Sequence, residues 1–371
     1  MRPKLVKPVV RYLTFAGLIF VFAFGPGTSL LIAGGPPPAE SVATDQTIAQ
    51  AVVTHAHPPQ DFHPLSASGA ELERYGFPPR PDAVRARTPY AHWKKIVSVP
   101  RVANPTLQQT TIYNGPIRNM SIVRALKNGI VSATSQNWSG YAITGAIGTF
   151  VENNAYVFSQ WVVPRAQQAF GVCSGFWDYS SQWDGFDGIA SSDVLQAGTE
   201  ADAYCSGSTP IPFYSAWIEW FPFPETRVSI PAVRPGDLMG SEVWYTTAPP
   251  FGHAYLVNYT LQQAGAYSFN PPSGAAFLGN SAEWIEERPV IGTTLTDLTN
   301  YVADQFNVAY AYNTGSYFLP RTSPAGTTTL AISMACPAWT PGSSCPSTTT
   351  ISAPYLYGPW SLWFYDFPPA F

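Results

Sequence analysis

The sequence predicts an all-β fold, an antiparallel β-sandwich of two packed, curved sheets, preceded by a signal sequence and a propeptide. The chain contains 37 prolines and 29 glycines, which disfavour long helices. Hydrophobic residues make up 46% of the chain, and its β-branched and aromatic residues form short runs. Turn sequences separate these runs, and no helical segments alternate with them. Many short strands without intervening helices are typical of antiparallel sandwiches.

The expected strands share a high content of valine, tyrosine, tryptophan and other residues that favour an extended backbone. They cover residues 154–164, 214–222, 241–247, 253–263 and 281–287. The turn sequences RPGD, APPFGH and NPPSG lie between the later runs. Because side chains alternate between the two faces of a strand, each run presents two distinct sets of residues.

The run SAEWIEE at residues 281–287 holds three carboxylates, although only 11% of the residues in the chain are charged. Alternation puts Glu283 and Glu287 on one face and Glu286 on the other face with Trp284. A solvent-facing position on an ordinary strand is the simplest interpretation of any one of these glutamates, and Glu286 fits it best. In the run at residues 214–222, alternation groups three residues on one face: Trp217, Glu219 and Phe221.

The N-terminal part divides into two segments of different composition. In residues 1–34, four basic residues precede an apolar run from Leu13 to Phe24. This pattern predicts a signal peptide, with an uncleaved membrane anchor as the alternative. Residues 35–130 are rich in proline, hold ten lysines and arginines, and are poorly suited to an independent core. We expect a basic propeptide there, with a plain linker as the alternative, followed by a β-sandwich domain over residues 131–371.

Charge changes sign along the chain. Residues 1–130 carry 14 Lys and Arg against 6 Asp and Glu, whereas residues 131–371 carry 5 Arg, no Lys and 17 Asp and Glu. A segment with few cations limits self-repulsion when its carboxylates are protonated, so it suits acidic conditions. Its negative charge argues against nucleic-acid binding, and near neutral pH it would attract the basic propeptide.

The acidic part lacks the motifs of several hydrolase classes. It contains one histidine, His253, and no GxSxG sequence, so a serine triad is not expected. HExxH is absent, as are the phosphate-binding glycine motifs and the paired D-T-G or D-S-G sequences of an aspartic dyad. Carboxylate and amide chemistry remains.

Four cysteines lie in the acidic part: Cys173, Cys205, Cys336 and Cys345. An even number in an exported chain predicts two disulfides, for which three pairings are possible. We favour Cys173–Cys205 and Cys336–Cys345, because each pair closes a short loop rich in Gly, Ser or Pro. No CxxC spacing is present, so a zinc site is not expected.

Several ordered pieces of the acidic part resemble the eqolisins, the glutamic endopeptidases. The pieces are NWSGY, QWVVP, WDGFDG, VLQAGT, AWIEWFP and AEWIEERP, and they follow the order of the family from Asn137 to Pro289. The resemblance implies that residues 131–371 form a glutamic peptidase domain whose catalytic pair is Gln196 and Glu287. It also implies a substrate cleft with these residues: Trp138, Trp183, Asp187, Trp217, Glu219 and Phe221. Arg288 departs from the family pattern, because an acidic residue is common there.

Peptide hydrolysis by such a pair needs neither a metal nor a cofactor. We expect Glu287 to act as general base and then general acid, and neighbouring donors to keep its pKa low. The amide of Gln196 would donate a hydrogen bond to the oxyanion, and Glu283 would tune the site. The alternative function is an exported carbohydrate-binding β-sandwich, or a glycosidase that uses paired carboxylates.

The expected partners are polypeptide substrates and the protein's own propeptide, with no nucleic acid and no membrane after processing. We expect a monomer that is secreted into an acidic, extracellular environment. Acidification would weaken the charge contact of the propeptide, which would then be cleaved near residues 125–135.

Overall fold

The computed structural model describes residues 52–125, 129–151, 155–168, 176–206, 209–313, 316–322, 325–335, 350–358 and 361–366. The expected signal or anchor segment at residues 1–34 lies outside this part of the chain. Cys173, Cys336 and Cys345 also lie outside it, and the Cys205 side chain is not described, so the disulfides stay predictions. None of the helices in the described ranges has the length and apolarity needed to span a membrane.

The first sheet carries the residues singled out by the sequence. Its strands pair antiparallel in the spatial order β2 (Leu107–Gln109), β12 (Thr226–Val228), β11 (Thr209–Phe221), β10 (Val194–Ser206), β9 (Ser181–Asp187), β16 (Ser281–Glu287), β6 (Trp138–Thr144) and β21 (Thr328–Ala335). β8 (Trp177–Asp178) also pairs with β10, while β5 (Ile130–Ser135) runs parallel to β21 and pairs with β4 (Ser121–Ala125).

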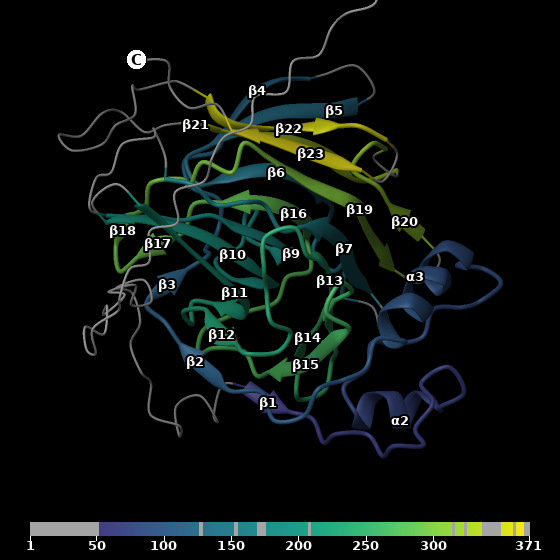
Figure 1. The fold of residues 1–371 in the computed structure, drawn as a ribbon. Coiled ribbons are helices and arrows are strands. Elements are labelled where there is room, and N and C mark those ends of the chain that lie inside the picture. Colours follow the sequence, from purple (N-terminus) through teal and green to yellow (C-terminus); the bar gives the residue numbers. More distant parts are fainter. Residues whose placement is uncertain are drawn as a thin grey trace, which may run out of the picture. The chain divides into compact units, whose positions relative to one another are not determined.

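The second sheet packs against the first (Figure 1). Its order is β1 (Val52–Thr54), β15 (Gln263–Phe269), β14 (Gly252–Asn258), β13 (Leu238–Tyr245), β7 (Tyr156–Val162), β19 (Ala303–Asn313), β23 (Leu362–Asp366) and β22 (Thr350–Leu356), with β20 (Ser316–Phe318) beside β19. β22 also pairs with β21, which joins the two sheets along one edge. The expected all-β sandwich is confirmed.

The strand boundaries follow the sequence closely in one case and depart from it in another. β16 covers the expected residues 281–287. The single strand expected over residues 253–263 is wrong, because β14 ends at Asn258 and β15 begins at Gln263. The side chain of Asn258 accepts a hydrogen bond from the backbone N–H of Leu261 at 2.8 Å, which stabilises a turn between the two strands.

Alternation along the first sheet separates a core face from an opposite face. Leu195, Phe186 and Trp284 lie in the hydrophobic core between the sheets, with Leu256 and Trp161 of the second sheet. The residues that alternate with these along each strand form a separate buried cluster on the other face of the first sheet. We call this other face the site face. This cluster includes Trp138, Trp183, Trp217 and Ile285, with Phe221 packed against it.

The described part of the N-terminal segment, from residue 52 onward, packs on the domain, and its buried apolar residues share a cluster with those of the domain. It contains two helices that the sequence did not predict, α2 (Gly69–Arg74) and α3 (Arg87–Val97) (Figure 1). Trp93 and Ile96 of α3 join a cluster with Phe158 and Tyr310, which lie on the outer face of the second sheet. Strands β1 and β2 each extend one of the two sheets. This segment therefore shares its buried surface with residues 131–371.

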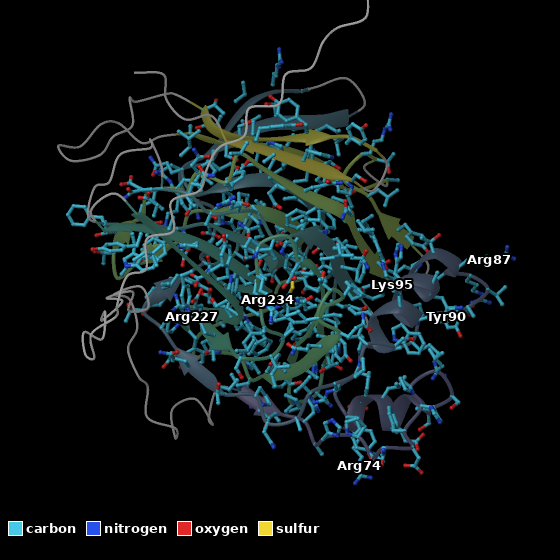
Figure 2. The ribbon with its side chains drawn as sticks, in the orientation of Figure 1. Arg74, Arg87, Tyr90, Lys95, Arg227 and Arg234 are labelled. Atoms are coloured by element: carbon cyan, nitrogen blue, oxygen red, sulfur yellow. The ribbon has the colours of Figure 1, made fainter. Side chains whose placement is uncertain are left out.

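The described part of this segment contacts the domain through apolar side chains, through backbone hydrogen bonds and through a cation near an aromatic ring. The ammonium of Lys95, labelled in Figure 2, lies 4.7 Å from the centre of the Tyr259 ring. Between described residues, ion pairs join Arg227 to Glu200 at 2.8 Å and to Glu225 at 3.2 Å, and all three residues belong to the domain. Attraction between the basic segment and the acidic domain therefore stays a prediction.

Candidate active site

Glu287 is the last residue of β16 and lies on the site face. β16 pairs with β6 on one side, where Glu287 is opposite Trp138, and with β9 on the other, where it is opposite Ser181. Its side chain is fully buried. Alternation places Glu283 on the same face and Glu286 on the opposite one, as the sequence predicted.

Three N–H groups hold the carboxylate of Glu287. The amide of Asn137 donates to Oε1 at 2.9 Å. The indole N–H groups of Trp138 and Trp183 both donate to Oε2, at 2.9 Å and 3.0 Å. A carboxylate oxygen has two lone pairs, so Oε2 is saturated and Oε1 retains one acceptor position. Oε1 is therefore the atom of Glu287 that is able to accept a further hydrogen bond.

Gln196 lies two strands away on the same face. It belongs to β10, which is separated from β16 by β9, and it is opposite Glu219 of β11. Its Nε2 donates to Glu219 Oε2 at 3.3 Å and to the backbone carbonyl oxygen of Asn114. Its Oε1 is buried and has no hydrogen-bond partner among the described residues. Gly185 of β9 lies between the two strands, and a side chain there would collide with Gln196.

A segment of the chain itself covers the pair. We call Tyr113–Ile117 the covering segment; its first residue ends β3 (Ile112–Tyr113), which pairs with β17 (Val290–Ile291), itself paired with β18 (Thr294–Leu295). The backbone N–H of Asn114 donates to Glu219 Oε1 and Oε2, at 3.2 Å and 3.0 Å. The carbonyl oxygen of Gly115 accepts from Trp138 Nε1 at 3.1 Å and from Asn137 Nδ2 at 3.5 Å. The side-chain groups around Gln196 and Glu287 thus bind the peptide backbone of the covering segment.

The aromatic residues expected at the cleft surround this segment or lie beneath it. Phe221 packs edge-on to Tyr113, with 6.4 Å between ring centres. A Cβ atom at Gly115 would lie 3.0 Å from the Phe221 ring, so only glycine fits there without displacement. Trp183 packs edge-on to Trp138 at 5.1 Å. Trp217 lies in the same cluster, and its Nε1 has no hydrogen-bond partner among the described residues.

Asp187 binds the backbone of the loop before β16. It lies at the end of β9 that is distant from Glu287, because Phe186 is opposite Ala282 whereas Ser181 is opposite Glu287. Its carboxylate accepts three backbone N–H groups, from Leu278, Gly279 and Asn280, at 2.7–3.0 Å. Burial raises the pKa of Asp187 to about 6, although these donors oppose the rise. The side chain of Asp187 therefore fixes the loop before β16.

Glu286 is not the solvent-facing residue that the sequence favoured. It is fully buried on the core face of the first sheet, where Gln182 Nε2 donates to both of its oxygens at 3.1 Å. The expectation of an exposed position is wrong because both faces of this sheet are covered, one by the second sheet and the other by the N-terminal segment.

Arg288, which the sequence left unexplained, fastens the loop before β6. Its Nε donates to the carbonyl oxygen of Gln136 at 2.7 Å, and its backbone N–H donates to the carbonyl oxygen of Asn137 at 3.1 Å. Burial lowers the pKa of Arg288 to about 10. This contact fixes the backbone that carries two of the donors to Glu287.

The pKa of Glu287 is raised well above its ordinary value, and burial is the cause. Hydrogen bonds from Asn137, Trp183 and Trp138 act in the opposite direction. The expectation of a low pKa is wrong for this state, because the covering segment keeps solvent away and desolvation outweighs three donors. Burial and the nearby Glu225 likewise raise the pKa of Glu219.

Sequence reasoning missed two participants. Asn137 is the first residue of the NWSGY piece. Its position next to Trp138 was the only signal in the sequence that it would contact Glu287. The covering segment has no motif, and only the fold brings it to the pair. Within the described ranges, no group of three His, Cys, Asp or Glu side chains is arranged to hold a metal ion.

Fold and site together define a β-sandwich protein with a carboxylate–amide pair on one sheet. A sequence profile of the Peptidase A4 family matches residues 136–352, more than half of the chain. The chain belongs to this family, the eqolisins, as the resemblance implied.

The chain is also similar to individual proteins. Aspergillopepsin-2 from Aspergillus niger is 28% identical over 191 residues, which are 49% of this chain and 66% of that protein, so the chain spans slightly less than two-thirds of that relative. Scytalido-glutamic peptidase, crystallised with a peptide-based transition-state analogue, is 20% identical over 62% of this chain and 98% of its own, with a TM-score of 0.47. Aspergilloglutamic peptidase from Aspergillus niger is 21% identical, and the match covers 51% of this chain and 99% of that protein, with a TM-score of 0.41.

Proposed function

We propose that this chain is a secreted, acid-active endopeptidase that hydrolyses peptide bonds with Gln196, Glu287 and an activated water. It is made as a precursor in which the N-terminal segment blocks the active site. Membership of the Peptidase A4 family favours peptide hydrolysis over the carbohydrate-binding alternative. Its substrates are polypeptides, and the reaction uses side chains of this chain alone.

One observation carries the proposal. The Gln196 amide donates to a peptide carbonyl oxygen, that of Asn114, while the carboxylate of Glu287 shares the donor Trp138 with the next carbonyl oxygen, that of Gly115. The pair is thus arranged around a peptide backbone, which is the chemical group that a peptidase must bind.

The chemistry follows from the hydrogen-bonding capacity of the two side chains. Oε1 of Glu287 has one free acceptor position, and Oε1 of Gln196 is a second acceptor, so a water held by both would be oriented for attack. The ionised Glu287 takes a proton from this water as it attacks the carbonyl carbon. Nε2 of Gln196 donates to the oxygen on which negative charge develops. Glu287 then gives the proton to the leaving nitrogen.

The dyad is tested by Gln196→Ala and Glu287→Gln, assayed on an acid-denatured protein at about pH 3. Each variant should lose activity while it retains the far-UV circular dichroism spectrum and the unfolding midpoint of the parent. Robust hydrolysis by either variant would refute the dyad. Glu286→Gln is the matched control, because it makes the same change on the same strand but on the core face, and its activity per folded molecule should persist.

Inhibition by the N-terminal segment is tested separately. The uncleaved precursor should not hydrolyse a soluble peptide at neutral pH, because the covering segment occupies the position that a substrate backbone would take. Full activity of a precursor shown by mass to be intact would contradict this part of the proposal and leave the dyad untouched.

A further inference from the structure

The covering segment crosses the site with one particular peptide bond between the two proposed catalytic groups. On one side of that bond, Gln196 Nε2 donates to the carbonyl oxygen of Asn114. On the other side, Trp138 Nε1 donates both to the carbonyl oxygen of Gly115 and to Glu287 Oε2. The N–H of Asn114 is fixed by Glu219, so the backbone is held on both sides of the bond.

We propose that the peptide bond between Asn114 and Gly115 is a self-cleavage site, cut by the Gln196–Glu287 pair of the same molecule. This inference rests on the proposed function and identifies the first peptide bond that the enzyme would hydrolyse. It points to a bond upstream of residues 125–135, where the sequence led us to expect maturation.

The hydrogen bonds select this bond over its neighbour. The carbonyl that contacts the Gln196 amide belongs to Asn114, so the developing oxyanion would form there. The carbonyl of Gly115 is bound by the donors from Trp138 and Asn137, and the nitrogen beyond it belongs to Pro116. The backbone N–H of Ile117 donates to the carbonyl oxygen of Gly188 at 3.2 Å, which holds the chain after the bond.

The step balances with one water molecule. The water oxygen forms a bond to the carbonyl carbon of Asn114, and its proton passes to Glu287. The C–N bond to Gly115 then breaks, Glu287 returns the proton to the Gly115 nitrogen, and the products are a carboxyl group on Asn114 and an amine on Gly115. No oxidant, metal or other reactant is required.

Cleavage would also loosen the covering segment. The new carboxylate of Asn114 would form beside Glu219, whose Oε2 accepts from the backbone N–H of Asn114 at 3.0 Å. The side-chain amide of Asn114 also donates to Glu225 Oε2 at 3.3 Å. An unpaired carboxylate is costly to bury, so the cut end is driven out of the site. Residues from Gly115 onward stay attached, because the backbone N–H of Arg118 donates to Asn137 Oδ1 at 2.8 Å.

The test uses the full-length precursor, incubated between pH 3 and pH 7 and followed by intact mass and N-terminal sequencing. The first new N-terminus should be Gly-Pro-Ile-Arg-Asn, and in H₂¹⁸O the label should enter the carboxyl group of Asn114. The rate should be first-order and independent of protein concentration, since the bond and the pair belong to one molecule. The Glu287→Gln precursor in the same buffers controls for spontaneous hydrolysis at an Asn–Gly bond and should stay intact.

A pair of glycine variants tests the geometry. Gly115→Val places atoms against the Phe221 ring and should slow this cut by about 10- to 100-fold, because the carbonyl moves away from Gln196. Gly69→Val is the control, since a Cβ at Gly69 meets no atom within 4 Å, and it should leave the cut unchanged.

Two results separate this inference from the proposed function. If the chain hydrolyses an added denatured protein but makes its first cut at another bond, the self-cleavage site is wrong and the peptidase stands. If neither the added protein nor the precursor is hydrolysed at any pH, and Glu287→Gln behaves as the parent does, both proposals fail.

Discussion

The indole nitrogen of Trp138 lies 2.9 Å from Oε2 of Glu287, directly across the β6–β16 pair. The indole N–H stabilises the ionised carboxylate, and the ring also packs against Trp183, the second donor to the same oxygen. This relationship links the NWSGY piece to the glutamate of AEWIEERP, two motifs separated by about 150 residues.

Trp138→Phe should therefore lower kcat for an added peptide by about 10- to 100-fold, the range expected when a charged group loses one hydrogen bond. The acidic limb of the kcat/KM profile should move to higher pH, because the lost donor favoured the ionised form of Glu287. Trp220→Phe is the matched control: it removes an indole bond of 3.0 Å to Asp193 on the core face and should leave the pH limb in place. An unshifted limb in Trp138→Phe would show that the N–H does not tune Glu287.

A second prediction concerns stability and pH. Burial between the sheets raises the pKa of Asp184 from its ordinary 3.8 to about 7, although the hydroxyls of Ser241 and Ser159 oppose the rise. Burial, with a further contribution from Asp184, also raises the pKa of Glu242. A carboxyl whose folded pKa is raised gives its full stability below the unfolded pKa, and this stability is lost as pH rises toward the folded value. The protein should therefore unfold at a lower temperature at pH 7 than at pH 4.

Asp184→Asn should reduce this difference, because the amide cannot ionise and is close in volume. Thermal unfolding would be followed by circular dichroism at both pH values in a Glu287→Gln background, which prevents self-cleavage. The exposed Asp61→Asn variant is the control and should keep the parental difference in Tm. If Asp184→Asn keeps it too, Asp184 is not a source of the pH dependence.

Local sequence rules correctly predicted the faces of the strands. Period-two alternation placed Glu287 apart from Glu286, and Gln196 and Glu219 do lie on the face that carries Glu287. Alternation gives no information about what covers each face, so Glu286 was expected in solvent although both faces are buried. The resemblance to a family supplied the pairing of Gln196 with Glu287, which strand patterns alone could not select.

The covering segment could not be predicted for a physical reason. Tyr113–Ile117 binds through its backbone carbonyl and N–H groups, which every residue possesses. Its position depends on pairings such as β3 with β17, between residues that are far apart in the sequence. The surroundings also constrain two of its positions, because the amide of Asn114 is buried against Glu225 and a Cβ at Gly115 would press on the Phe221 ring.

A third prediction follows from the raised pKa of Glu287 in the covered state. Self-cleavage needs the ionised carboxylate with the covering segment in place, so its rate should fall about tenfold per pH unit below that pKa. After the segment leaves, water reaches the site, the desolvation that raised the pKa is relieved, and hydrolysis of an added peptide should persist to lower pH. Rate constants for both reactions between pH 3 and pH 7 test this, and coincident acidic limbs would contradict it.

The last prediction concerns acid release of the N-terminal segment, for which we propose that two histidines sharing one hydroxyl act as the pH sensor. Nε2 of His55 lies 2.6 Å from Ser268 Oγ, and Nδ1 of His253 lies 2.7 Å from the same oxygen. Burial and the nearby Arg101 lower the pKa of His55, and burial, with His55, lowers the pKa of His253 from 6.5 to about 4. A histidine with a lowered folded pKa weakens the folded contact as pH falls below its unfolded value, because the detached form takes up the proton. The β1–β15 contact should therefore loosen between about pH 6.5 and pH 4.

Hydrogen–deuterium exchange of residues 52–60, corrected for intrinsic rates and measured in the Glu287→Gln precursor, should show lost protection over this window. His55→Gln should flatten the dependence and the exposed His63→Gln should preserve it; equal pH dependence in both variants would exclude His55 as the sensor.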